Sequence, residues 1–124
     1  MQRKKMAKKY LMVITHSDDD QDRANGAVGM AVSLLGEGAD LALFFVFEGA
    51  RMARKGIAET IEGDHMTPVR ELFPMVLAAE VPMYVCGACV KKYSIPEDEI
   101  VTGIKIATLP TVTAEMMDRE TIMF

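Results

Sequence analysis

Residues 9–36 read KYLMVITHSDDDQDRANGAVGMAVSLLG and contain the parts of one strand–loop–helix unit. The run 10–14 is apolar throughout, which is typical of a strand buried on both faces of a sheet. After a polar loop, apolar side chains recur at the spacing of one helix face: Ala24, Ala27, Val28, Ala31, Val32 and Leu35. Acidic residues precede this face, and Gly36 and Gly38 follow it, as expected at the two ends of a helix.

The same alternation continues along the chain. Four further stretches are typical of strands: the apolar runs 41–47 and 81–85, a strand within 101–108 around Ile104 and Ile106, and the last residues 121–124. Between them a helix is expected at 67–77, with Thr67 as its N-cap and Pro68 at its first position, and another at 111–118. Strands that alternate with helices are joined by right-handed crossovers, so we predict a three-layer α/β fold with a mainly parallel five-stranded sheet. The order of the strands does not follow from the sequence.

Length and charge limit the class of protein. A chain of 124 residues suits one domain, which we place at 9–124 after a basic N-terminal tail at 1–8. The net charge is -4, and five of the fourteen basic residues lie within 3–9, so the rest of the chain is acidic. Nucleic-acid binding would need a basic face running through the fold, and we expect none.

No apolar run is long enough for a membrane span, and 10–14 is too short for the core of a secretory signal. We therefore expect a cytoplasmic protein without a membrane partner. Cytoplasmic thiols stay reduced, so a Cys-x-x-Cys pair there is more often reactive or metal-binding than a structural disulfide.

Both cysteines lie in residues 84–95, which read YVCGACVKKYSI. Cys86 is expected where the third strand leaves the sheet, and Gly87 begins a helix whose first turn holds Cys89. The free N–H groups and positive dipole at a helix start stabilise a thiolate, and Lys91 adds positive charge about one turn later. The stretch therefore predicts sulfur chemistry, with Cys86 and Cys89 as the catalytic candidates and Gly87 and Lys91 in support.

Other interpretations of the two thiols remain open. Cys86 could be a small buried hydrophobic residue, and Cys89 could resolve a disulfide, accept sulfur from Cys86 or pack against the sheet. A zinc or iron–sulfur site would need further ligands, and the only histidines are His16 and His65, so we expect no metal. Gly26 and Gly29 lie within a helix face and form no dinucleotide fingerprint, and we expect no cofactor.

Chemistry in parallel sheets gathers at the carboxyl ends of the strands. His16, Glu48 and Cys86 each follow a predicted strand and could share one rim. His16 is therefore a supporting candidate that could lower the pKa of the thiol or transfer a proton. The three aspartates after it are interpreted as acids that favour a helix start rather than as a cation site.

The chain resembles the DsrE/DsrF-like (DsrEFH) sulfurtransferase family, which includes TusD-type and YchN-type proteins. The resemblance rests on three stretches: 85–95 with its Val-Cys-Gly-x-Cys motif, 13–16, and the strand that ends in Glu48-Gly49-Ala50. It implies a flavodoxin-like sheet, homotrimers or homohexamers, and a persulfide carried on Cys86. Tyr93-Ser94 stands where members often have Arg-Gly, and the second cysteine is not universal among them.

Our leading hypothesis is a sulfur carrier, or sulfurtransferase, whose partners are a sulfur donor protein and an acceptor protein. Thiol exchange of this kind needs one accessible thiolate and a leaving thiol. The first alternative is a thiol–disulfide redox protein that cycles Cys86 and Cys89. The second is a non-catalytic assembly or regulatory subunit in which both cysteines are structural.

Overall fold

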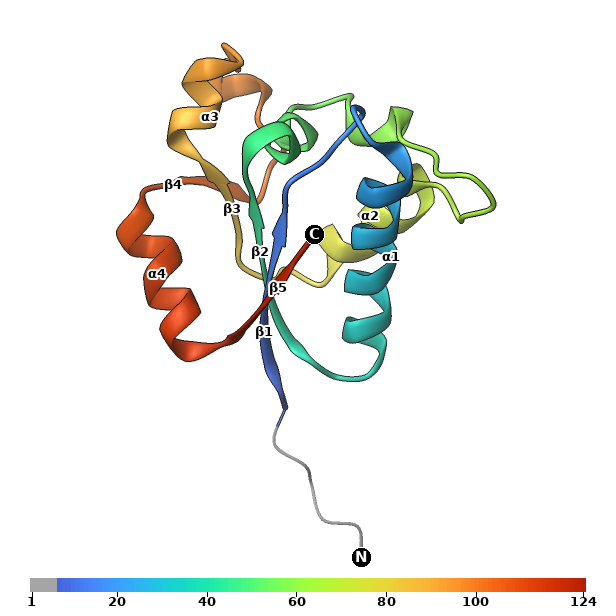
Figure 1. Ribbon diagram of the computed structural model, residues 1–124, viewed down its shortest axis with the longest axis vertical. Helices are drawn as coiled ribbons and strands as arrows, with labels where there is room; N and C mark the ends of the chain where they lie inside the picture. Colours follow the sequence, from blue (N-terminus) through green and yellow to red (C-terminus); the bar gives the residue numbers. More distant parts are fainter. Residues whose placement is uncertain (1–6) are drawn as a thin grey trace, which may run out of the picture.

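The computed structural model describes residues 7–124 (Figure 1). Strands, α-helices and 3-10 helices (η) follow one another in this order: β1 (Lys9–Ile14), α1 (Gln21–Gly36), β2 (Asp40–Phe45), η1 (Phe47–Ala53), η2 (Ala58–Thr60), α2 (Val69–Ala78), β3 (Met83–Cys86), α3 (Gly87–Lys92), η3 (Glu97–Glu99), β4 (Ile104–Ala107), α4 (Leu109–Asp118) and β5 (Glu120–Met123). Of the predicted tail, only Ala7 and Lys8 lie within the described residues. None of the helices found there is long and apolar enough to span a membrane.

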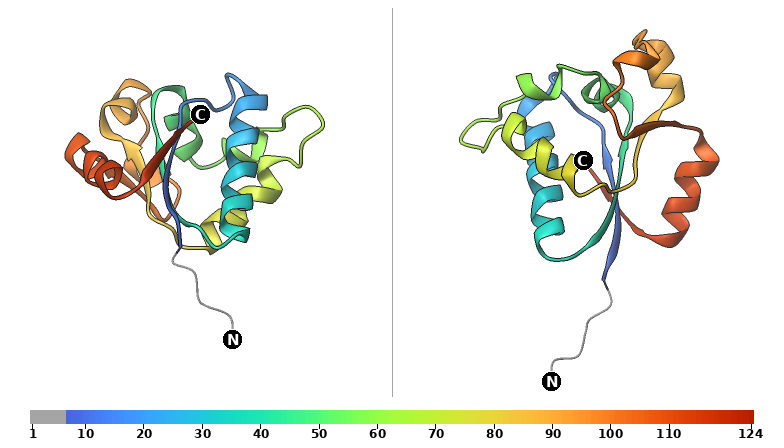
Figure 2. Two further views of the ribbon diagram at one scale, coloured as in Figure 1. Left: turned by 60° about the horizontal axis from the view of Figure 1, so that its bottom comes forward. Right: turned by 180° about the vertical axis from the view of Figure 1, so that it is seen from behind.

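The sheet has five strands in the order β4-β3-β2-β1-β5, and all four neighbouring pairs are parallel. The first four strands step across the sheet in one direction, and β5 returns to the other side of β1. Helices α1 and α2 cover one face and α4 the other (Figures 1 and 2). The predicted three-layer α/β fold with its parallel five-stranded sheet is thus confirmed, and all carboxyl ends lie at one edge.

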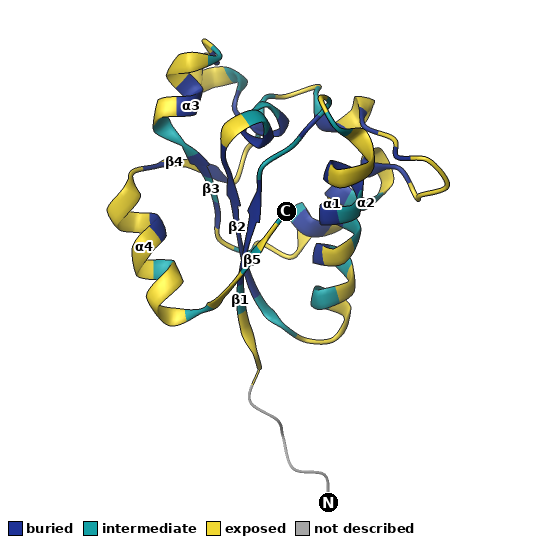
Figure 3. Cartoon of the chain, in the orientation of Figure 1, coloured by how far each residue is buried: buried dark blue, intermediate teal, exposed yellow. Residues whose placement is uncertain are grey.

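The core is centred on β1 and β2, whose apolar runs are buried from Leu11 to Ile14 and from Leu41 to Phe45 (Figure 3). Phe45 packs edge-on against Phe73 of α2, with ring centroids 6.4 Å apart. The neighbouring Phe44 therefore points to the opposite face, since side chains alternate along a strand. That face is the one on which α4 lies.

Several boundaries differ from the sequence predictions, among them the end of β2 and the start of α2. The apolar run 41–47 leaves the sheet at Phe45, and Phe47 already begins η1 with a backbone φ of 55°. Thr67 is not the N-cap of α2, because Pro68 takes the cap position and Val69 begins the helix. The Thr67 carbonyl instead accepts a hydrogen bond from the Asn25 side chain at 2.8 Å, which ties this loop to α1.

Candidate active site

Cys86 lies where the sequence predicts it, at the carboxyl end of β3. It is the last residue of the strand and the N-cap residue of α3, with φ -61° and ψ 123°. The new helix starts close against β4: a β-carbon on Gly87 would be at van der Waals distance, 3.4 Å, from the Ala107 carbonyl oxygen and from Ile106 Cγ2. The strand–helix junction thus holds the Cys86 thiol beside the edge strand β4.

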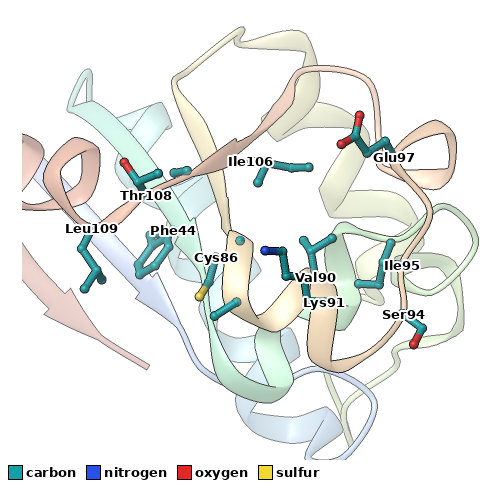
Figure 4. Close-up of a pocket in the computed structure, with 13 residues that line it drawn as sticks. Phe44, Cys86, Val90, Lys91, Ser94, Ile95, Glu97, Ile106, Thr108 and Leu109 are labelled. Atoms are coloured by element: carbon teal, nitrogen blue, oxygen red, sulfur yellow. The ribbon is translucent and has the colours of Figure 1, made fainter.

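The Cys86 side chain lines a cavity of about 710 Å³ between α3, β4 and the start of α4 (Figure 4). Most of its wall is apolar and comes from Phe44, Val90, Ile95, Ile106 and Leu109. The polar side chains at the wall are those of Lys91, Ser94, Glu97 and Thr108. The volume is within the range of small-molecule sites, about 300–1,000 Å³, and far exceeds what a single sulfur atom needs.

Cys89 has a different environment, although it is only three residues away. Its side chain is buried, with 7% exposed, and it is not part of the cavity wall. Its Sγ accepts a hydrogen bond from the backbone N–H of Phe47 at 3.2 Å. Burial and hydrogen bonding with the neighbouring Cys86 thiol raise the pKa of Cys89, while the Phe47 N–H and the charge of Lys92 offset part of this.

The donor to Cys89 is held in an unusual backbone conformation. Phe47 has φ 55° in the left-handed region, which costs a residue with a side chain about 1–2 kcal/mol. The phenylalanine ring is 63% exposed, so burial of the ring does not offset this cost. The conformation aims the N–H of the residue that begins η1 at the buried sulfur.

A chain of polar side chains joins the end of α3 to the loops that follow β1 and β2. The Tyr93 hydroxyl donates to Glu48 at 2.6 Å, Arg51 donates to Glu48 at 3.2 Å, and Arg51 also donates to Asp18 at 2.7 Å. The hydrogen bond to Glu48 raises the pKa of Tyr93 to about 12, and the same bond lowers the pKa of Glu48. This chain holds η1 against α3 and so supports the contact between Phe47 and Cys89.

His16 lies in the loop after β1, and its Nδ1 is 2.8 Å from Asp19 Oδ2. Partial burial by itself raises the pKa of Asp19. The His16 hydrogen bond and charge, together with the Ser17 N–H, outweigh this, so the pKa of Asp19 is lowered. His16 is not part of the wall around Cys86. The structure therefore brings Cys86, Gly87 and Lys91 together at the cavity, places Cys89 behind it, and holds His16 against Asp19.

The sequence reasoning missed Phe47 as a partner of Cys89. Nothing in its local pattern separates it from the apolar run of β2, and the contact spans 42 positions of the chain. Within residues 7–124, no group of three or more His, Cys, Asp or Glu side chains could hold a metal ion.

The model of the DsrE/DsrF-like family matches residues 8–124. The chain belongs to the DsrE/DsrF-like family. Among its relatives, an uncharacterized protein of Methanopyrus kandleri is 23% identical over 113 residues, covering 91% of this chain and 90% of that protein. An uncharacterized protein of Methanocaldococcus jannaschii is 24% identical over 115 residues, covering 93% and 97%.

Two solved structures have the same DsrE/DsrF-like fold. The ychN protein from E. coli superposes with a TM-score of 0.77 at 16% identity, covering 96% of this chain and all of that one. The protein MTH1491 of unknown function from Methanobacterium thermoautotrophicum has a TM-score of 0.73 at 10% identity, covering 94% and 99%. At these identities the likeness shows the fold alone, and the chemistry of the site is inferred from the geometry of this chain.

Proposed function

We propose that this DsrE/DsrF-like protein is a cytoplasmic sulfur carrier that holds a persulfide on Cys86 and passes the sulfane sulfur between partner proteins. The observation that carries the proposal is the different surroundings of the two thiols. Cys86 lines a large, mostly apolar cavity, and Cys89 is buried outside it. Family membership supports the same chemistry.

Loading and unloading are both thiol exchange reactions. The Cys86 thiolate attacks the outer sulfur of a donor persulfide, R–S–SH, and R–S⁻ leaves with the electron pair of the broken S–S bond. The acceptor's thiolate later attacks the outer sulfur of Cys86–S–SH, and the Cys86 thiolate leaves. The sulfane sulfur keeps its oxidation state in both steps, so the transfer itself needs no electron donor or acceptor.

The cavity suits both the holding and the transfer of sulfur. Its apolar wall limits contact between water and the outer sulfur, while Lys91 places a positive charge at the wall for an anionic persulfide. The volume beyond the added sulfur leaves room for the chain segment that brings a donor or acceptor thiol. Specificity would then come from the partner segment that fits this space.

Exposed apolar side chains on α4 support protein partners and self-association into a homotrimer or homohexamer. Met117 is 89% exposed and Leu109 72%, and Val112 is the one residue buried in this helix. Most of α4 is exposed (Figure 3). Large apolar surface of this kind commonly marks an interface. Sedimentation should show an oligomer that dissociates in Leu109→Lys/Met117→Glu, and a monomeric wild type would contradict this part of the proposal.

The sulfur site is tested by intact mass after treatment with glutathione persulfide, whose leaving group is glutathione. We expect Cys89→Ser to gain about 32 Da, reversibly on treatment with a thiol reductant, because a sulfinic acid of similar mass would persist. Cys86→Ser is the matched control and should gain nothing. Equal labelling of both variants, or of neither, would contradict a carrier site at Cys86.

A further inference from the structure

We propose that Cys89 discharges the loaded carrier: its thiolate attacks Cys86–S–SH at the inner sulfur, forms a Cys86–Cys89 disulfide and releases hydrosulfide. This inference rests on the proposed persulfide at Cys86 and adds a second activity to it, the conversion of sulfane sulfur to sulfide. It is carried by the position of Cys89 relative to the cavity and by the Phe47 N–H aimed at its sulfur.

The two thiols are close enough for direct attack. The N-cap residue and the third residue of a helix lie on one side, with β-carbons about 5–6 Å apart. The Cys86 thiol is also among the groups that raise the pKa of Cys89. Both cysteines are free, and the Cys86 side chain makes no capping hydrogen bond to the start of α3.

The cavity decides which sulfur is attacked. An outer sulfur on Cys86 extends into the space that Cys86 lines, and a leaving hydrosulfide has that space to enter. Cys89 lies outside the wall and is buried, so it has no comparable space in which to hold an extra sulfur. Transfer of the outer sulfur onto Cys89 would need such space, whereas attack on the inner sulfur adds no atom at Cys89.

The Phe47 N–H supplies the electrostatic part of the step. It donates to the Cys89 sulfur at 3.2 Å and stabilises negative charge there before the attack. Its left-handed backbone holds the donor in place even though the ring outside is exposed. Strained residues of this kind cluster at functional sites.

The step balances as Cys89–SH + Cys86–S–S⁻ → Cys86–S–S–Cys89 + HS⁻: the Cys89 proton passes to the outer sulfur, and the resulting Cys89 thiolate attacks the inner sulfur. The bond between the two sulfurs of the persulfide breaks, and its electron pair leaves on the outer sulfur, which is thereby reduced to sulfide. Cys86 and Cys89 are together oxidised to the disulfide. A dithiol reductant returns both to thiols by two successive exchanges and readies Cys86 for another sulfur.

The test loads the full chain with glutathione persulfide without oxygen, removes the small molecules, and follows intact mass and released sulfide. Wild type should lose its added sulfur, end about 2 Da below the reduced protein, and release one sulfide per loaded chain. Cys89→Ser and Cys89→Ala should keep the added sulfur at least about tenfold longer, because attack by a positioned intramolecular thiol outpaces attack by a thiol of another chain.

The outcomes separate this inference from the function on which it rests. If wild type and Cys89→Ser both load at Cys86 and then lose sulfur at the same rate, the discharge step is overturned and the proposed carrier function stands. A persistent adduct that fragment masses place on Cys89 would overturn it too, in favour of sulfur transfer between the thiols. Failure of Cys89→Ser to load at all would overturn the proposed function itself.

Discussion

Replacing Gly49 by alanine is expected to destabilise the protein by about 3 kcal/mol. Gly49 lies in η1, and a β-carbon on it would come 2.0 Å from the Ile14 carbonyl oxygen and 2.7 Å from the Ile14 carbonyl carbon. Ordinary contacts begin at 3.4 Å, and the obstructing atoms are backbone at the end of the buried strand β1, so no side chain can rotate away. That oxygen also accepts the Val46 N–H at 3.0 Å, a bond that the displacement would strain.

The matched control is Gly26→Ala in the interior of α1, where a β-carbon would meet nothing within 4 Å. We expect it to stabilise the protein by about 0.5–1 kcal/mol, since alanine is the better helix former. Urea titration of both variants measures the difference, and thermal melting should place Gly49→Ala about 10 °C below wild type. A Gly49→Ala variant within about 0.5 kcal/mol of wild type would refute the close approach of η1 to β1.

Three further predictions concern charges. In Glu48→Gln, the pKa of Tyr93 should fall from about 12 toward 10, because the lost carboxylate had favoured the protonated phenol; absorbance titration of the tyrosinates measures this, and an unchanged curve contradicts the bond. The raised pKa of Cys89 keeps it a thiol to higher pH. With iodoacetamide, followed by mass, the first label should add quickly at pH 7 on Cys86, and the second should add on Cys89 at a rate that rises with pH. Two equally fast labels would contradict the burial of Cys89. Arg119→Ala should lower the free energy of unfolding by about 2–4 kcal/mol in urea titrations, because the Arg119 side chain is 7% exposed between two carboxylates. Lys9→Ala, which removes an exposed ion pair, should lower it by under about 0.5 kcal/mol. Equal losses would contradict the buried cluster around Arg119.

The strand–loop–helix unit at 9–36 could be predicted because each of its signals is local. The apolar run of β1, the cap at Asp20 and the small-residue face of α1 each come from a few neighbouring residues. The strand order could not be predicted, because a right-handed crossover is equally possible to either side of a strand. Only packing between distant segments sends β5 back to β1 while the other strands continue outward.

The position of Cys86 followed from the sequence, but the difference between the two cysteines did not. Spacing alone puts both at the start of α3. What separates them is η1, which folds over Cys89 and leaves Cys86 facing the cavity. The sequence predicts Phe47 as part of the strand 41–47, since it continues an apolar run. The contact that buries Cys89 is made by a backbone N–H, which no side-chain pattern records.

The different environments of Cys86 and Cys89 limit how long the proposed carrier holds its persulfide. An acceptor thiol must enter the cavity to reach the outer sulfur, whereas Cys89 approaches the inner sulfur from α3 and needs no entry. The two routes compete for one persulfide, and only the first depends on the concentration of the partner. A loaded chain that meets its acceptor quickly therefore passes on sulfane sulfur, and one that waits releases sulfide. Removing Cys89 should leave the yield of transfer independent of acceptor concentration, while wild type should approach that yield only when the acceptor is abundant.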